Sequence, residues 1–255
     1  MPLLGAGCTW PLIGLSGQAT ERCRFSPPTN VNGEHLPCGR IPLIDSGNDG
    51  RKNGDMPVAA HASYLINLAT GPDKAEQSVT SFAEELRRCL QLGIGLVVIH
   101  PGSHGGASVE IGVARVAHHL DLALESAGVL DADLKVMLET TAGQGASLGS
   151  RFEELGEMLA TSRFPEHLGS CVDTCHIFAA GYDFLAAEGY ARTVELLERH
   201  VGLGRIHLLH LNDSKKECGS WVDRHEQIGA GCIGREEHPI VMAPAPPLMP
   251  VDKIV

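Results

Sequence analysis

The segment "CVDTCHIFAAGYDF", residues 171–184, contains the residues whose spacing points most clearly to chemistry. An acid, Asp173, and an imidazole, His176, follow a short apolar run. Side chains three positions apart in an extended strand point to opposite faces, so the pair cannot hold one metal ion from inside a regular strand. If the strand ends at Asp173 and the chain then turns, the two side chains can face two different metals. The spacing therefore indicates a site with several metals and with further ligands from elsewhere in the chain.

Strand-like and helix-like segments alternate through the central part of the chain. Short apolar stretches bounded by glycine or polar residues are typical of buried parallel strands: "PVAAHAS", "IGLVVIHPG", "LKVMLETTAG", "GSCVDTCH" and "RIHLLHLND". Between them, segments such as 78–93 and 112–128 place apolar residues three and four apart, and each of these two ends in a glycine. This alternation predicts βα units and a parallel sheet.

A polar residue stands at the end of each predicted strand. These residues recur at intervals of 34 to 39 positions and are His61, His100, Glu139, Asp173 and His210. The repeat places them at the carboxyl ends of the strands, where (β/α)8 barrels have their chemistry. An open doubly wound sheet would gather them at one switch point instead. The sequence therefore predicts an α/β protein of the (β/α)8 TIM-barrel type, incomplete, with about five convincing βα units.

Imidazoles and carboxylates together suit zinc, and equally manganese or iron. In "VDRH", Asp223 and His225 are two positions apart and so lie on one face of an extended loop, where they could share a metal with His176. His104 follows His100 by four positions across a Pro-Gly turn, and it is predicted to orient the ligands by hydrogen bonds. The joint placement of these residues favours a metal site over a set of isolated structural histidines.

The remaining histidines and the cysteines are interpreted as structural. Helix-surface or loop positions are predicted for five histidines: His118, His119, His167, His200 and His238. His207 lies on the opposite strand face from His210 and is expected to pack against a helix. The eight cysteines contain no CxxC pair and are predicted to be free thiols, with Cys171 and Cys175 as small buried residues.

The composition is that of a soluble globular protein, with 43% hydrophobic and 20% charged residues. A formal net charge of −11 argues against a protein that holds nucleic acid by a basic surface alone. No run approaches the ~18 apolar residues of a membrane span, and no export signal is recognisable. We therefore expect no membrane partner and a cytoplasmic protein, or a nuclear one if its source is eukaryotic.

The two ends of the chain differ from its centre. Residues 1–56 are rich in Gly, Pro, Ser and Asn without helical or strand periodicity, which predicts an irregular, disordered or non-native segment. Residues 235–255 form a Pro-rich tail that is also predicted to be irregular. The predicted domain therefore spans residues 57–234.

Six motifs together resemble the endonuclease IV family of zinc-dependent apurinic/apyrimidinic endonucleases: "HASYLINLA", "HPGSH", "LETTAGQG", "CVDTCHIFAAGYD", "HLNDSKK" and "VDRHEQIGAGCIG". The likeness runs from about residue 58 to residue 234, and the last three motifs are highly specific. Members of that family are (β/α)8 barrels with three zinc ions that cut the DNA backbone 5′ to an abasic site during base excision repair. The resemblance implies the same activity here, with abasic double-stranded DNA as the partner of a monomeric enzyme.

The resemblance also implies a role for each ligand-type residue. Three zinc ions would divide the ligands between them: His61, His100 and Glu139 for the first; Glu139, Asp173 and His210, which also count as catalytic, for the second; His176, Asp223 and His225 for the third. The ions would make a cationic pocket that receives a phosphodiester and activates water. Tyr64 would line the DNA groove, and Lys215, Lys216 and Arg224 are candidates for phosphate contacts.

The sequence departs from the family pattern at both ends. Residues 1–56 do not resemble the family's first two βα units. The family's ninth ligand is a glutamate on the last barrel strand, and Glu236 and Glu237 come too early in the chain to match it. A truncated barrel is therefore predicted, with a weakly bound second zinc and with catalysis that is poor or lost.

Two other functions remain open at this stage. Sugar isomerases and epimerases of the xylose-isomerase-like barrels also surround a pocket with Glu, Asp and His. They need only one or two metals, however, so that "VDRH" and His176 would be surplus. A non-catalytic metal-binding or DNA-binding remnant is compatible with the missing glutamate and the missing entry loops.

Overall fold

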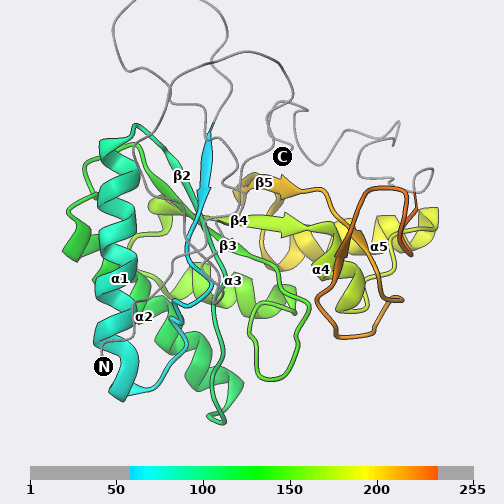
Figure 1. Cartoon of the computed structure of the whole chain (residues 1–255), viewed down its shortest axis with the longest axis horizontal. Coiled ribbons are helices and arrows are strands. Elements are labelled where there is room, and N and C mark those ends of the chain that lie inside the picture. Colours follow the sequence, from blue (N-terminus) through cyan, green and yellow to red (C-terminus); the bar gives the residue numbers. More distant parts are fainter. Residues whose placement is uncertain (1–57, 235–255) are drawn as a thin grey trace, which may run out of the picture.

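The computed structural model describes residues 58–234, so the segments predicted to be irregular, 1–56 and 235–255, lie outside the described residues. Figure 1 shows one parallel sheet whose strand order, β1-β2-β3-β4-β5, follows the sequence. Its strands are β1 (Ala59–His61), β2 (Leu96–Ile99), β3 (Lys135–Glu139), β4 (Leu168–Asp173) and β5 (Ile206–His210). Each strand pairs in parallel with its neighbour in sequence, which confirms the predicted βα units and the incomplete barrel.

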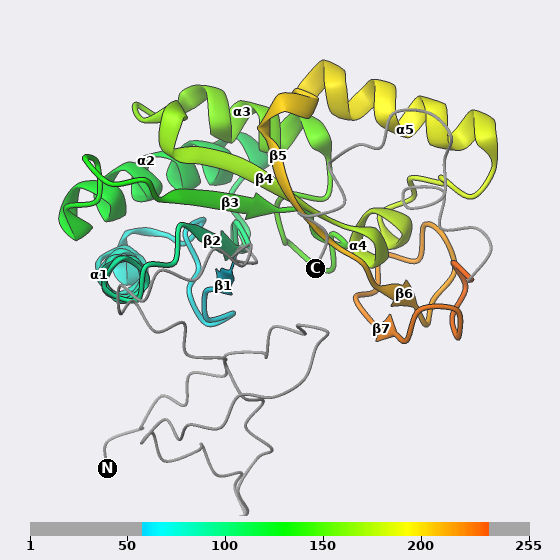
Figure 2. The same cartoon turned by 90° about the horizontal axis from the view of Figure 1, so that it is seen from above.

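Helices connect the strands and cover one side of the curved sheet (Figure 2). They are α1 (Pro72–Gln91), α2 (Val109–Ala127), α3 (Phe152–Thr161), α4 (Thr174–Ala179) and α5 (Ala187–His200), with 3-10 turns at Pro165–His167 and Leu203–Arg205. The short α4 and a two-stranded antiparallel hairpin, β6 (Asp213–Ser214) with β7 (His225–Glu226), lie beyond the carboxyl ends of the strands. Within residues 58–234, none of the helices combines the length and the apolar character needed to cross a bilayer.

The helix boundaries follow local chemistry. At the start of α2, the Ser108 hydroxyl accepts a hydrogen bond from the Ile111 backbone N–H (3.3 Å). The helix ends where Gly128 adopts the left-handed conformation with φ 68°. Helix α1 begins at Pro72, six positions before the segment that the apolar spacing indicated, because proline is favoured in the first turn. Leu90 is one of the regularly spaced apolar residues of the segment 78–93, which predicts a buried position, yet it is 43% exposed.

The sheet has a different chemistry on each face. Side chains two positions apart in a strand share a face. Residues that point toward the helices form the main core together with the helix side chains, for example Val97, Ile99 and Val136. The opposite, inner face carries a small buried apolar layer: Ala59, Val98, Met137, Cys171 and Leu208. The ligand-type residues follow two positions later, at the ends of these strands or, for His100, one residue past the end of β2, so they form the next layer of this inner face.

Two of the histidines predicted to lie on a helix surface or in a loop are buried and hydrogen-bonded instead. His119 Nδ1 lies 2.7 Å from the Leu68 carbonyl, and His167 Nδ1 lies 3.0 Å from the Leu134 carbonyl. Cys171 and Cys175 are buried free thiols, as predicted. The prediction for His238 lies outside the described part of the chain.

Candidate metal centre

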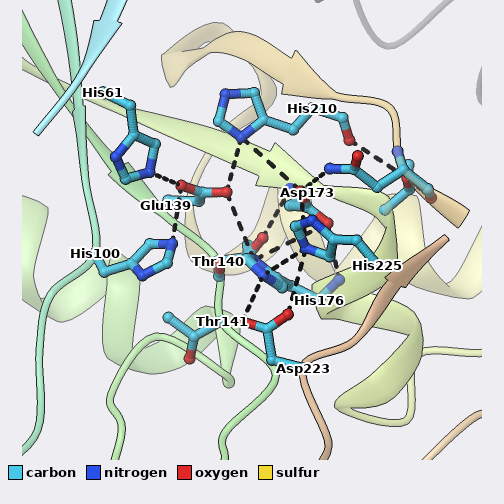
Figure 3. A network of polar contacts seen from close by, with 12 residues as sticks. His61, His100, Glu139, Thr140, Thr141, Asp173, His176, His210, Asp223 and His225 are labelled. Atoms are coloured by element: carbon cyan, nitrogen blue, oxygen red, sulfur yellow. Dashed lines mark hydrogen bonds and ion pairs between the residues drawn. The ribbon is translucent and has the colours of Figure 1, made fainter. Parts of the chain in front are cut away.

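The eight predicted ligand residues meet at the carboxyl end of the sheet, as Figure 3 shows. They are His61, His100, Glu139, Asp173, His176, His210, Asp223 and His225. Five come from the strand ends, one from α4, and two from the hairpin segment that leads into β7. Their potential ligand atoms form overlapping groups in which all atoms lie within 4.8 Å of one another. The fold therefore gathers side chains that are up to 164 positions apart into one cluster.

The Glu139 carboxylate stands at the centre of the cluster and is 1% exposed. Its Oε2 atom lies 2.8 Å from His61 Nε2 and 3.1 Å from His100 Nε2. Its Oε1 atom lies 2.8 Å from His210 Nδ1. The two oxygens therefore face two separate sets of imidazoles, which is the arrangement of a carboxylate able to bridge two metal ions.

A second group of donors lies on the other side of the cluster. His176 Nε2 is 3.1 Å from His225 Nε2 and 3.3 Å from an Asp223 oxygen. The second Asp223 oxygen is 3.4 Å from His225 Nε2. Ligand atoms around a tetrahedral zinc with bonds of ~2.1 Å lie about 3.4 Å apart. The spacing of these three side chains therefore fits a zinc ion.

Backbone carbonyls set the orientation of two imidazoles. The His176 ring lies with Nδ1 2.7 Å from the Thr140 carbonyl, and the His61 ring with Nδ1 2.7 Å from the Ala62 carbonyl. Because a carbonyl only accepts, Nδ1 carries the proton and the Nε2 lone pair is left to face the cluster. Hydrogen bonding of this kind is typical of histidines that bind metals.

Asp173 lies at the junction between β4 and α4 and is fully buried. One oxygen accepts a hydrogen bond from the His176 backbone N–H (3.0 Å) and caps α4, a helix where the sequence indicated only a turn. The other oxygen accepts from the Asn212 side-chain amide. The strand ends at Asp173 and the chain turns there, so the His176 ring reaches Asp223 and His225. The Asp173 Oδ2 atom lies 3.9 Å from His210 Nδ1 and 3.8 Å from His225 Nε2.

Electrostatics favours a cation at the cluster. Burial lowers the pKa of His176, but the charges of nearby carboxylates, Asp173 first among them, raise it to about 10. The pKa values of His61 and His210 are also raised, because Glu139 outweighs their burial. Burial raises the pKa of Glu139, yet His210 and His100 hold it well below its usual range. The buried carboxylates thus need positive charge beside them, which protons or metal ions can supply.

The residues predicted to contact DNA lie at the rim of the cluster. Tyr64 is 61% exposed and lines a cavity of about 210 Å³ together with His100 and Asp223. Lys215 and Arg224 are exposed on the β6–β7 hairpin, where Lys215 Nζ lies 3.7 Å from a Glu226 oxygen and Arg224 donates a hydrogen bond to the Asp223 carbonyl. Lys216, next in the chain, is exposed as well.

His104 does not take the place that the sequence indicated. Its ring makes no hydrogen bond to any of the eight cluster residues, and its buried Nδ1 has no partner among residues 58–234. The residue lines a separate cavity of about 1,100 Å³ beside α1. Gly102, with φ 102°, turns the chain just before it. The prediction that His104 orients the ligands is therefore not supported by the structure.

Several residues around the cluster were missed at the sequence level. The Thr140 hydroxyl accepts a hydrogen bond from the Asp173 backbone N–H (2.9 Å), in addition to the carbonyl contact with His176. Trp221, two positions before Asp223, has φ 56° and is the sole described non-glycine residue with positive φ. Thr140, Asn212 and Trp221 all lie within two positions of a ligand residue in the sequence, and this proximity is the signal that could have found them.

The fold and the cluster agree with comparisons to known proteins. A family model described as a xylose isomerase-like TIM barrel matches residues 47–238 and defines the class of the fold. A probable endonuclease 4 of Chloroflexus aurantiacus (strain J-10-fl) is 52% identical over 188 residues, which cover 73% of this chain and 65% of that protein. A probable endonuclease 4 of Geobacter sulfurreducens is 45% identical over 236 residues, covering 83% and 77%. The chain belongs to the endonuclease IV family of these barrels.

A solved structure supports the same relationship. The crystal structure of endonuclease IV from Thermus thermophilus is 39% identical and superposes with a TM-score of 0.64, over 74% of this chain and 65% of that one. The chain therefore spans about two thirds of the length of the Chloroflexus and Thermus proteins that it matches.

Proposed function

We propose that the chain is a zinc-dependent phosphodiesterase that hydrolyses the DNA backbone 5′ to abasic sites. The observation that carries the proposal is the division of the cluster around Glu139. One of its oxygens faces His61 and His100, the other faces His210, and a third donor group surrounds His176. Three adjacent donor groups exceed the one or two metals that a sugar isomerase needs, and they suit a phosphodiester with several negatively charged oxygens.

The donors fit zinc. The set consists of imidazole nitrogens and carboxylate oxygens, which bind zinc at similar distances. We assign three positions: His61, His100 and Glu139; Glu139, Asp173 and His210; His176, Asp223 and His225. The donors of the first and third lie within 4.8 Å of one another. The second is assigned because His210 Nδ1 lies 2.8 Å from Glu139 and 3.9 Å from Asp173. The third group already has the spacing of a tetrahedral site, and carbonyls orient His61 and His176 so that Nε2 of each faces the other donors. When bound, zinc ions would supply positive charge for the phosphate and lower the pKa of water.

The side chains of the cluster would do the positioning. The carboxylates of Glu139 and Asp173 are both almost fully buried and would fix the positions of the zinc ions. The positive charge of these ions would in turn hold the reacting phosphate in place. The Thr140 carbonyl restrains the His176 ring and the Asn212 amide restrains the Asp173 carboxylate, each through a hydrogen bond. Rigid placement of this kind lowers the reorganisation needed during the reaction.

The middle position is proposed to bind zinc most weakly. Besides Glu139, this position has two donors, His210 Nδ1 and Asp173 Oδ2, and these two atoms lie 3.9 Å apart. The same Asp173 oxygen also accepts a hydrogen bond from Asn212, and Glu139 is shared with the first position. Fewer exclusive donors mean lower affinity, and catalysis would be limited by occupancy of this position.

The exposed rim would receive the DNA. Tyr64 stands on the cavity that reaches His100 and Asp223, where its ring could contact a nucleotide beside the scissile phosphate. Lys215, Lys216 and Arg224 project from the hairpin and would pair with backbone phosphates. These contacts would be local, since the whole chain carries a net charge of −11.

The proposal is tested with an end-labelled duplex that contains one abasic site. Zinc-loaded protein is expected to nick this duplex immediately 5′ to the lesion and to leave an intact duplex uncut. His210→Ala should abolish the nick, whereas His118→Ala, an exposed histidine on α2, should not. A parallel incubation with a ketose and an aldose tests isomerisation. Isomerisation without nicking, or neither reaction with zinc bound, would overturn the proposed function.

A further inference from the structure

Two residues of the cluster lie on an exposed segment and need an anchor. The side chains of Asp223 and His225 are 43% and 44% exposed. They lie just before and within β7, the second strand of a hairpin that pairs with β6 over only two residue pairs. Figure 2 shows β6 and β7 side by side beyond the end of β5. So short a hairpin is marginal without further restraint.

The restraint is found at Asp213, the first residue of β6. Its side chain is fully buried, and five backbone N–H groups donate to its two oxygens. Oδ1 accepts from Ser214 (2.7 Å) and Ile233 (2.8 Å). Oδ2 accepts from Gly229 (3.0 Å), Gly231 (3.0 Å) and Gly234 (3.1 Å). Within residues 58–234, no Lys or Arg side chain forms an ion pair with this carboxylate, so the backbone donors compensate its charge.

Four of the five donors come from the segment that follows β7, and the fifth is Ser214 in β6 itself. Asp213 therefore joins the start of the hairpin to the chain beyond its end, and the segment with Asp223 and His225 is closed into a loop. Gly231 has to be a glycine, because a Cβ there would lie 2.4 Å from the Ser214 carbonyl and 2.5 Å from Asp213 Oδ1. The backbone is thus fitted closely around the carboxylate.

We propose that Asp213 is a positioning residue that holds Asp223 and His225 at the third metal position. The inference rests on the proposed three-zinc function and adds a residue to it. Asp213 does not touch the metal donors itself; it acts through the backbone of the hairpin, where Ser214 pairs with His225 and Asp213 pairs with Glu226. Residues that hold metal ligands in place typically change metal affinity by about 10–100-fold when they are replaced.

The test is zinc release from the full-length, zinc-loaded protein into a colorimetric chelator. In Asp213→Asn the amide keeps one acceptor oxygen, while its NH2 group opposes N–H donors, so the loop should loosen without a change in side-chain size. We expect one zinc to leave at least about tenfold faster and the other two to keep the wild-type rate. His225→Ala, which removes a donor directly, identifies the zinc in question.

Two further variants keep the result decisive. Asp183→Asn is the matched control, since Asp183 is exposed and accepts one backbone N–H, and it should release zinc at the wild-type rate. Gly229→Ala, at a φ of 85°, should strain the loop mildly and accelerate release of the same zinc by a smaller factor. If Asp213→Asn cannot be obtained folded, Gly229→Ala decides alone.

The outcomes separate this inference from the proposed function. Wild-type release of all zinc from folded Asp213→Asn, or from Gly229→Ala where that variant decides alone, overturns the positioning role and leaves the proposed function standing. The inference is also overturned if the wild-type protein nicks abasic DNA but His225→Ala holds as much zinc as the wild type. Wild-type protein that takes up no zinc contradicts both.

Discussion

The Nε2 atoms of His176 and His225 lie 3.1 Å apart, and the opposite nitrogen of His176 is held by the Thr140 carbonyl. Two imidazole lone pairs at this distance repel each other unless a proton or a metal ion lies between them. Asp223, within 3.4 Å of both rings, adds a negative charge that attracts such a cation. The pair therefore forms a position that is occupied by protons when metal is absent.

Zinc binding should consequently release protons. The pKa of His176 is raised to about 10 and those of His61 and His210 are raised as well, so the metal-free cluster holds protons at pH 7. We expect roughly one to three protons to leave per chain when zinc binds. Calorimetric titration at pH 7 in two buffers of different ionisation enthalpy measures that number. Equal heats in both buffers would contradict the expectation, and His225→Ala should release fewer protons than the wild type.

The metal-free protein should lose stability as the pH rises. A histidine whose pKa is higher in the folded state stabilises the fold fully below the unfolded value of 6.5, and this contribution is lost as the pH rises through the folded value, here about 10. The free energy of unfolding of chelator-treated protein, measured with urea, should thus be lower at pH 8.5 than at pH 7. In His176→Gln this difference should shrink. A stability that increases over this interval would show that His176 is neutral in the metal-free fold.

Glu139→Gln should disrupt two metal positions at once. The amide keeps the shape of the side chain but removes the charge and one of the two acceptor oxygens that face His61 and His210. We expect zinc content, measured by mass spectrometry, to fall by more than one ion per chain and nicking to fall by at least about 100-fold. The control is Glu157→Gln, an exposed position on α3. Loss of only one zinc would mean that Glu139 serves a single position.

Gly143→Ala should disturb the segment that carries Asp223. A Cβ at this position would lie 2.6 Å and 2.7 Å from two carbons of the Trp221 ring, and the residue has φ 74°. The substitution should lower the free energy of unfolding by roughly 1–3 kcal/mol and accelerate release of the zinc near Asp223. Gly145→Ala is the matched control, because Gly145 has φ 69° but nothing within 4 Å of a Cβ. Equal effects of the two variants would assign the loss to backbone strain alone.

The sequence was sufficient to predict the strands and the convergence of the ligand residues at one edge of the sheet, for a physical reason. Parallel βα units bring the carboxyl end of each strand to one edge, so a polar residue at the end of each apolar stretch already indicates where Glu139 and His210 lie. The short-range spacing in "DTCH" and "VDRH" was informative because the turn after Asp173 is local.

Features that depend on the path of the backbone could not be found in this way. Nothing in the residue type marks Thr140 as the source of a carbonyl for His176, and the partners of Asp213 are 16 to 21 positions away, apart from its neighbour Ser214. His104 lies close to His100 in sequence, yet the turn at Gly102 directs it into another cavity. Leu90 follows the helical period of α1 but is exposed, so periodicity alone does not decide whether a residue near a helix end is covered.

The alternation of the inner sheet face ties the donors to strand pairing. In β3, Met137 packs in the apolar layer and Glu139 follows on the same side; in β5, Leu208 and His210 do the same. Sliding either strand by one residue would turn its donor into the helix layer and bring a wrong side chain inward. Only a correctly aligned sheet can therefore complete the cluster, and metal uptake during refolding would report directly on whether the strands have found their proper alignment.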